Sequence, residues 1–102
     1  MRIGTVLVRG PSMVPALYDG DRLLVGWRAA VRAGDLVVAR FRERPDLLVV
    51  KRAVARSEGG WLLESENPFV TGPSGVADVE ARVLVRLWPL SRRAEGRRRP
   101  SR

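Results

Sequence analysis

The sequence contains no cysteine and no histidine among its 102 residues. Without cysteine the chain can form no disulfide, no thiolate metal site and no cysteine nucleophile. Without histidine it lacks the usual general base of hydrolases and the commonest metal ligand in proteins. Acid–base chemistry must therefore come from carboxylates, the amino terminus or lysine, and we expect no metal and no other cofactor.

Long apolar runs are also missing. No run approaches the roughly 18 residues that a membrane helix needs, and residues 1–8 lack the apolar length of a secretory signal. Hydrophobic residues still make up 45% of the sequence, which is ordinary for a globular protein. We therefore expect one small soluble domain in the cytoplasm of a bacterial-type cell, with membrane association only if an anchor precedes this sequence.

Lysine is nearly absent, since Lys51 is the single exception among nineteen basic residues. An arginine-rich genome would produce this bias by itself. The bias nevertheless marks one position where arginine was not used. Arginine cannot lose its proton in a protein, whereas burial can drive a lysine toward the neutral amine.

The net charge of +8 favours polyanions as partners, but the charge is unevenly distributed. Residues 91–102 hold six arginines and one glutamate, which accounts for +5 of the total. We expect residues 1–90 to form the domain and residues 91–102 to be a basic, disordered tail, with specific anion binding by the tail as the alternative. A non-catalytic basic β-domain that binds nucleic acid is one functional alternative. Its six aromatic residues are scattered along the chain, however, rather than gathered for base stacking.

Short apolar and β-branched stretches, separated by Gly and Asp turns, predict β-strands. No segment shows sustained helical periodicity, although residues 13–17 have the length of one helical turn. The expected fold is mainly β, a small coiled or barrel-like sheet. The strands are expected at 2–9, 22–27, 32–42, 45–56, 59–65 and 79–90.

The stretch "GPSMVP" places Ser12 between two prolines, which fix the chain locally. Gly10 allows the backbone to bend sharply, and the amide of Ser12 is placed to face a developing oxyanion. Pro11 has no amide to contribute. A serine held in this way is a candidate nucleophile that needs a base.

Alternation along the strand at 47–56 puts Lys51 on one face with Val49 and Ala53, and Arg52 and Arg56 on the other. The lysine either stretches to the rim of the sheet or loses its proton through desolvation. In the second case it can activate Ser12. A serine–lysine dyad is an established variant of the catalytic triad.

Three motifs in order resemble those of the type I signal peptidase superfamily. "GPSMVPAL" resembles its Gly-X-Ser-Met-X-Pro-Thr-Leu nucleophile box, "VVKRAV" its Lys-Arg box and "ESENPFVT" its Gly-Asp-Asn-Pro box. The resemblance extends from about Val8 to Pro89. It implies the β catalytic core of that superfamily, with Ser12 as nucleophile, Lys51 as general base and no cofactor.

The resemblance also implies supporting residues. Thr71 falls where the superfamily has a hydroxyl that orients the lysine, with a strand-end cap as the alternative role. Gly10 falls where some members carry a serine that adds an oxyanion donor, so that donor is absent here. Met13 belongs to the nucleophile box, and Pro15 is expected to border the substrate groove.

The third motif departs from the superfamily pattern after Thr71. An Asp-Ser-Arg sequence normally follows and braces the site, whereas Gly72-Pro73 stands here, and Glu66 replaces the usual aspartate. The residues that support the dyad are therefore expected to be more weakly held. Asp21 fits the Gly-Asp turn that follows the nucleophile box.

Within the superfamily, "RPDLLVVKRAV", "NPFVTG" and "GVADVEARV" most resemble the nickel-type superoxide dismutase maturation proteases. This resemblance implies that the partner is the dismutase precursor and that a short N-terminal leader is removed from it. The nickel would belong to the substrate. The alternative is a signal peptidase I-type processing enzyme whose anchor is missing from this sequence.

Overall fold

A computed structural model of the chain describes residues 2–69 and 72–88. Thr71 and the basic segment 91–102 lie outside the described residues. The described residues contain no helix long and apolar enough to cross a membrane. They form six strands: β1 (Arg2–Leu7), β2 (Arg22–Trp27), β3 (Leu36–Phe41), β4 (Leu48–Ser57), β5 (Gly60–Glu64) and β6 (Val76–Trp88).

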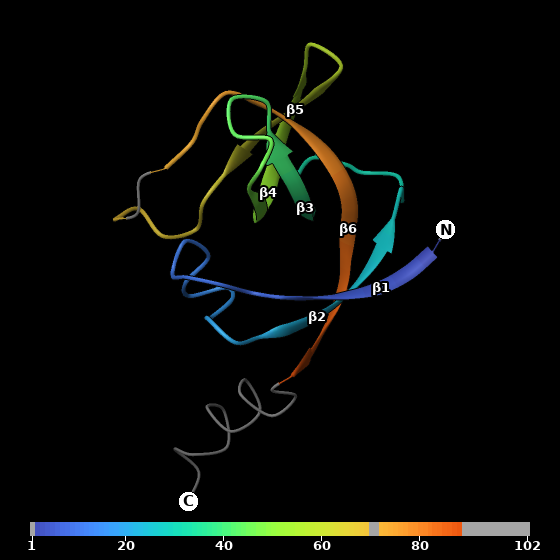
Figure 1. The fold of residues 1–102 in the computed structure, drawn as a ribbon, viewed down its shortest axis with the longest axis vertical. Helices are drawn as coiled ribbons and strands as arrows, with labels where there is room; N and C mark the ends of the chain where they lie inside the picture. Colours follow the sequence, from blue (N-terminus) through green and yellow to red (C-terminus); the bar gives the residue numbers. More distant parts are fainter. Residues whose placement is uncertain (1, 70–71, 89–102) are drawn as a thin grey trace, which may run out of the picture.

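The strands form one antiparallel sheet in the order β1-β2-β6-β3-β4-β5, and β5 also pairs with β6. Strands β3, β4, β5 and β6 therefore close on themselves, and β1 and β2 extend the sheet from β6. Figure 1 shows the long β6 curving between these two parts. The prediction of a mainly β, barrel-like fold is confirmed.

The strand limits follow from local turn chemistry. β2 has the predicted limits, but β3 begins four residues later than predicted because Arg32 to Asp35 form a turn. In that turn the Asp35 carboxylate accepts a hydrogen bond from the Arg32 amide at 2.9 Å, and Gly34 adopts a φ of 97°. The apolar residues that follow the turn then form the strand.

Two apolar clusters form the core, one on each side of the closed part of the sheet. The first cluster joins β2, β3 and β6 to the loop after β1, through Val8, Met13, Leu17, Leu23, Val25, Val38 and Ala81. The second fills the space between β3, β4, β5 and β6, through Val37, Ala39, Phe41, Ala53, Trp61 and Ala77. The loop after β1 is therefore part of the core.

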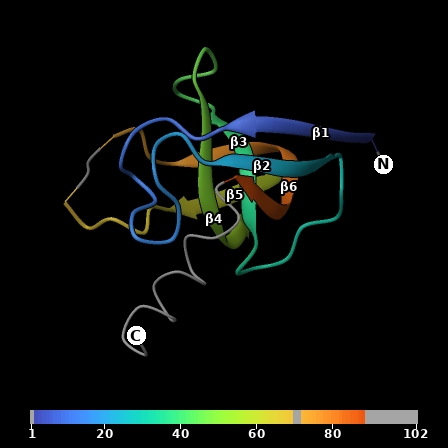
Figure 2. The same cartoon turned by 90° about the horizontal axis from the view of Figure 1, so that it is seen from below.

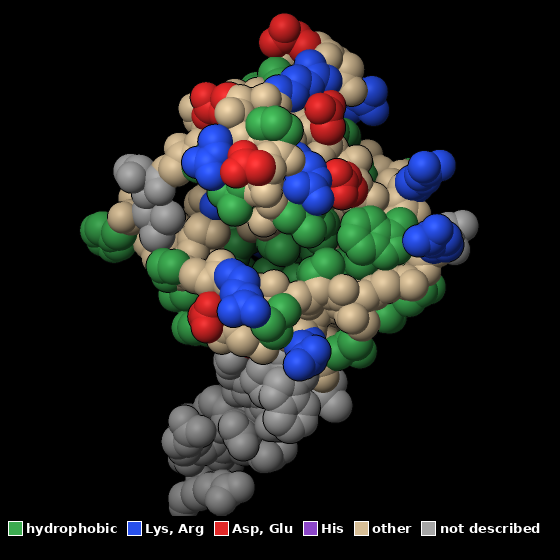
Figure 3. Space-filling view, in the orientation of Figure 1, with side chains coloured by type: hydrophobic (Ala, Val, Ile, Leu, Met, Phe, Trp, Pro, Cys, Tyr) green, Lys and Arg blue, Asp and Glu red, His purple; other side chains and the backbone are tan. Residues whose placement is uncertain are grey.

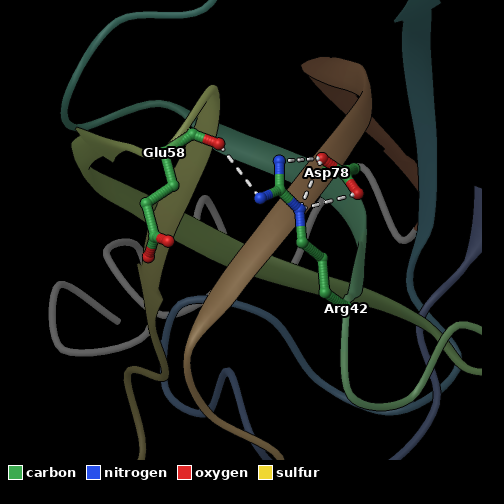
Figure 4. A network of polar contacts seen from close by, with 3 residues as sticks. All are labelled: Arg42, Glu58 and Asp78. Carbon is green, nitrogen blue, oxygen red and sulfur yellow. Dashed lines mark hydrogen bonds and ion pairs between the residues drawn. The ribbon is translucent and has the colours of Figure 1, made fainter.

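An exposed polar network joins the β4–β5 hairpin to the rest of the sheet (Figure 4). Arg42 donates to the Asp78 carboxylate on β6, at 2.8 Å for the closest pair, and to the main-chain carbonyl of Glu58 at 3.0 Å. The hydrogen bond from Arg42 lowers the pKa of Asp78. Glu58 and Gly59 take positive φ angles of 50° and 78°, as a tight hairpin requires.

The loop after β1 and the segment that follows β5 lie at the same end of the molecule, away from the start of β1. Figures 1 and 2 agree on this arrangement. On the face shown in Figure 3, hydrophobic side chains line a hollow, and basic and acidic side chains are interspersed around it.

Candidate active site

Residues 8–21 carry the candidate nucleophile Ser12 and are called the nucleophile loop below. This loop is closed at its base by hydrogen bonds. The Val8 amide donates to the Asp21 carbonyl and the Gly20 amide donates to the Val8 carbonyl, both at 2.8 Å. The Asp21 side chain is fully buried and accepts from the Tyr18 amide at 2.9 Å. Asp21 therefore occupies a structural turn, as the resemblance implied.

Ser12 is held by the packing of the residues that follow it. Met13 and Leu17 are buried in the first core cluster, and the Leu17 amide donates to the Met13 carbonyl at 2.7 Å. This bond closes a turn that is not helical, because the Val14–Pro15 peptide bond within it is cis. Pro15 is exposed on the outer side of this turn, after a cis peptide bond. The half-buried Ser12 thus begins a turn that is anchored in the core.

Asn67 bonds the nucleophile loop to the segment after β5. Its amide donates to the Ser12 carbonyl at 2.9 Å, and its side-chain Nδ2 donates to the Pro11 carbonyl at 3.0 Å. Its Oδ1 accepts from the Phe69 amide at 3.0 Å. The two peptide carbonyls that flank the Ser12 side chain are therefore both fixed by one residue. The sequence interpretation did not single out Asn67 as a site residue, although it stands in the third motif.

Lys51 lies in β4 opposite the fully buried Val37 of β3. Its side chain is half-buried, and the desolvation lowers the pKa of its ammonium. Its Nζ donates a hydrogen bond to Ser65 Oγ at 2.7 Å. Among the described residues, then, the polar partner of the lysine is a serine that sequence reasoning missed.

The position of Ser65 follows from the strand register. Arg52 of β4 is paired with Glu64 of β5, so the next positions along the two antiparallel chains are Lys51 and Ser65. Side chains at opposed positions project to the same face of a sheet. The sequence offered one signal of this role, the hydroxyl of Ser65 directly before Glu66-Asn67-Pro68. Interpreting that signal required the β4–β5 register.

Arg52 points to the other face and supports the same segment. It forms an ion pair with Glu66 and donates to the Gly34 carbonyl at 2.7 Å. The predicted alternation holds for Lys51 and Ala53 but ends there. A bulge between Ala53 and Ala55 shifts the pairing and leaves Ala55 exposed.

Ser12 and Lys51 line the same cavity, whose volume is about 250 Å³. Gly10 and Met13, which were predicted as supporting residues, also line it, whereas Pro15 does not. The substrate-groove role of Pro15 stays a prediction. Three stretches of the chain form the cavity walls: residues 7–13, residues 47–51 and residues 72–73.

The backbone amides of the nucleophile loop differ in their partners. The Gly10 amide donates to the Asp19 carboxylate at 2.8 Å, so it is occupied. The amides of Ser12 and Met13 donate to no acceptor within the described residues. They can therefore stabilise an anion that forms beside Ser12. Within the same residues, no group of three or more acidic side chains could hold a metal ion.

No curated protein matches the chain in a sequence comparison. A comparison with protein families matches residues 3–84 to the Peptidase S24-like family. The matched range includes both Ser12 and Lys51 and spans most of the described sheet. The match supports the superfamily that the motifs indicated and, at the level of the family, a peptidase of the serine–lysine type. The chain belongs to the Peptidase S24-like family.

Proposed function

We propose that the protein is a serine endopeptidase in which Ser12 is the nucleophile and Lys51 the general base. The observation that carries this proposal is that the two side chains line one cavity. Ser12 lies on a loop anchored in the core, and Lys51 is half-buried with a lowered pKa. A lowered pKa supports the role of base because only the neutral amine can accept a proton at moderate pH.

The proposed reaction begins with proton transfer from Ser12 Oγ to the neutral amine of Lys51. The serine oxygen attacks the carbonyl carbon of the scissile peptide, and the resulting ammonium returns its proton to the leaving amine. Water, deprotonated by the same lysine, then hydrolyses the acyl-enzyme and releases the new carboxyl terminus. The amides of Ser12 and Met13, which have no acceptor within residues 2–69 and 72–88, support the tetrahedral oxyanion in both steps.

The cavity suits an extended peptide segment. One wall is residues 7–13, which continue from β1, and the other is residues 47–51 at the start of β4. Within the described residues, β4 pairs with β3 along 48–52 but with β5 only from Arg52 onward. The start of β4 thus presents a free edge, to which an extended substrate can add as a strand.

We propose further that the substrate is the N-terminal leader of a precursor protein, in the cytoplasm, and that this precursor is that of a nickel superoxide dismutase. The support for the precursor is the resemblance of three stretches of this sequence to the maturation proteases. The support for a leader is the open, mostly apolar cavity beside Ser12.

The test is cleavage of a purified nickel dismutase precursor, followed by intact mass measurement. Wild-type protein should release the leader, and Ser12→Ala and Lys51→Ala should each reduce kcat/KM by at least about a thousandfold. Lys51→Arg should be equally inactive because a guanidinium stays protonated. Ser57→Ala, a serine in β4 outside the cavity, is the matched control and should cleave like the wild type.

Two results would test the assignment of the base separately from the identity of the substrate. Efficient cleavage by Lys51→Arg would refute the assignment of the base. Cleavage of a secretory signal peptide, with the dismutase precursor left intact, would contradict the proposed substrate and favour the signal-peptide processing alternative.

A further inference from the structure

Ser65 follows β5 directly and is half-buried. Its Oγ accepts the hydrogen bond from Lys51 Nζ at 2.7 Å. The chain contains one lysine, and within the described residues this hydroxyl is the group that binds its amine. The superfamily resemblance implied no role for Ser65.

We infer that Ser65 is a positioning residue, whose hydroxyl holds the amine of Lys51 at the wall of the cavity that Ser12 shares. This inference rests on the proposed function. It assigns to Ser65 the orienting role that the superfamily resemblance would give to Thr71.

The hydrogen bond restricts a side chain that is otherwise flexible. A lysine side chain has four rotatable bonds, and fixing its amine to one acceptor selects a small set of its rotamers. When one N–H of the neutral amine donates to Ser65, the lone pair is directed elsewhere and is free to accept a proton from Ser12. A base that is already oriented loses less entropy when it reacts.

The two residues that follow Ser65 hold its segment in place through their own contacts. Glu66 forms an ion pair with Arg52 on the opposite face, and Asn67 bonds to the carbonyl of Ser12. Residues 65–67 therefore contact both members of the proposed dyad, the lysine through a side chain and the serine loop through a backbone amide and a side-chain amide. The spacing between base and nucleophile depends on this short segment.

The test uses the fact that the chain has one lysine. Protein labelled with ¹³C-lysine gives one ε-carbon signal, whose titration reports the Lys51 amine directly. In Ser65→Ala the ammonium loses an acceptor that stabilises its charged form, so the titration midpoint should move to lower pH. Ser65→Thr keeps the hydroxyl and should restore the wild-type midpoint. Ser57→Ala should leave the midpoint unchanged.

Activity provides the second readout. Ser65→Ala should lose about 10- to 100-fold in kcat with KM within about twofold, because positioning acts on the chemical step. Ser65→Gly, which also lacks the hydroxyl, should behave like Ser65→Ala and replaces it if the alanine variant does not fold.

An unchanged midpoint in folded Ser65→Ala and Ser65→Gly overturns the inference, as does a shift in Thr71→Ala at least as large as that in Ser65→Ala. The titration does not require cleavage. If the wild-type protein cleaved no precursor, the proposed function would fail while the titration still answered whether Ser65 holds the lysine.

Discussion

Lys51 is partly withdrawn from water by the fold, so its charge is linked to the stability of the protein. Half-burial lowers the pKa of its ammonium in the folded state, whereas an unfolded chain has the ordinary lysine value of about 10.4. Between these two values the unfolded state binds more protons than the folded state. The free energy of unfolding therefore rises with pH across this range.

Lys51→Met removes this linkage. We predict that the stability of the wild-type protein, relative to the variant, increases as pH rises from the folded pKa of Lys51 toward about 10.4 and is constant below that folded pKa. Denaturant unfolding of both proteins at a series of pH values measures the difference. A difference that does not change with pH would show that the lysine is as solvated in the folded state as in the unfolded one.

At the residue scale, the sequence identifies some site residues and not others, for physical reasons. Ser12 and Lys51 stand out because the chain lacks histidine and cysteine and because one lysine occurs among many arginines. Ser65 and Asn67 do not stand out, since their roles depend on which backbone they lie beside. The partner of Ser65 follows from the β4–β5 register, and the partners of Asn67 are carbonyls 55 and 56 positions away in the chain.

At the scale of elements, the site depends on the contact between the nucleophile loop and the segment after β5. Neither is a regular strand or helix, and each is held by hydrogen bonds to the other and by burial of Met13 and Leu17. Loops that carry functional residues are commonly positioned in this way by a rigid scaffold.

Asn67→Ala should loosen this contact. The variant loses the side-chain hydrogen bonds to the Pro11 carbonyl and from the Phe69 amide, each worth about 0.5–1.5 kcal/mol. We predict a decrease of about 1–3 kcal/mol in the free energy of unfolding and a lower kcat/KM. Chemical denaturation and precursor cleavage are the measurements.

Ser74→Ala is the control for that variant, because Ser74 is exposed and, within the described residues, only its backbone amide is hydrogen bonded, to Glu43. It should match the wild type in both measurements. If Asn67→Ala were as stable and as active as the wild type, the nucleophile loop would be held by its own packing and not by the segment after β5.

The predicted strands correspond to the observed ones because their apolar residues pack into the two core clusters. Their ends were less predictable, since turn hydrogen bonds and pairing partners decide them. β6 begins at Val76, three residues before the predicted start, because Val76 and Ala77 pair with Leu62 and Trp61 of β5. The closure of the barrel comes from that pairing, which no local pattern in the sequence indicates.

At the scale of the whole molecule, residues 91–102 differ from the rest of the chain in their density of positive charge. Acidic and basic side chains are interspersed on the face shown in Figure 3, while residues 91–102 contribute +5 of the net +8. A mixed surface gives little long-range attraction for polyanions, and a cluster of arginines gives much more.

Removal of residues 91–102 should therefore abolish weak, salt-sensitive binding to single-stranded DNA and leave precursor cleavage within about twofold of the full chain. Fluorescence anisotropy at low and moderate salt measures the binding. Equal DNA affinity in the truncated and full-length proteins would favour a nucleic-acid-binding domain and count against the peptidase.

The most direct test of the account compares two titrations of one protein. The pH dependence of kcat/KM for precursor cleavage reports the base in the free enzyme, and the ¹³C signal of the one lysine reports the amine of Lys51. The account predicts that activity rises with pH at the midpoint where Lys51 loses its proton, and that this midpoint lies below about 10.4. A lysine that titrates at the ordinary value, while activity rises at a different pH, would contradict the claim that Lys51 activates Ser12.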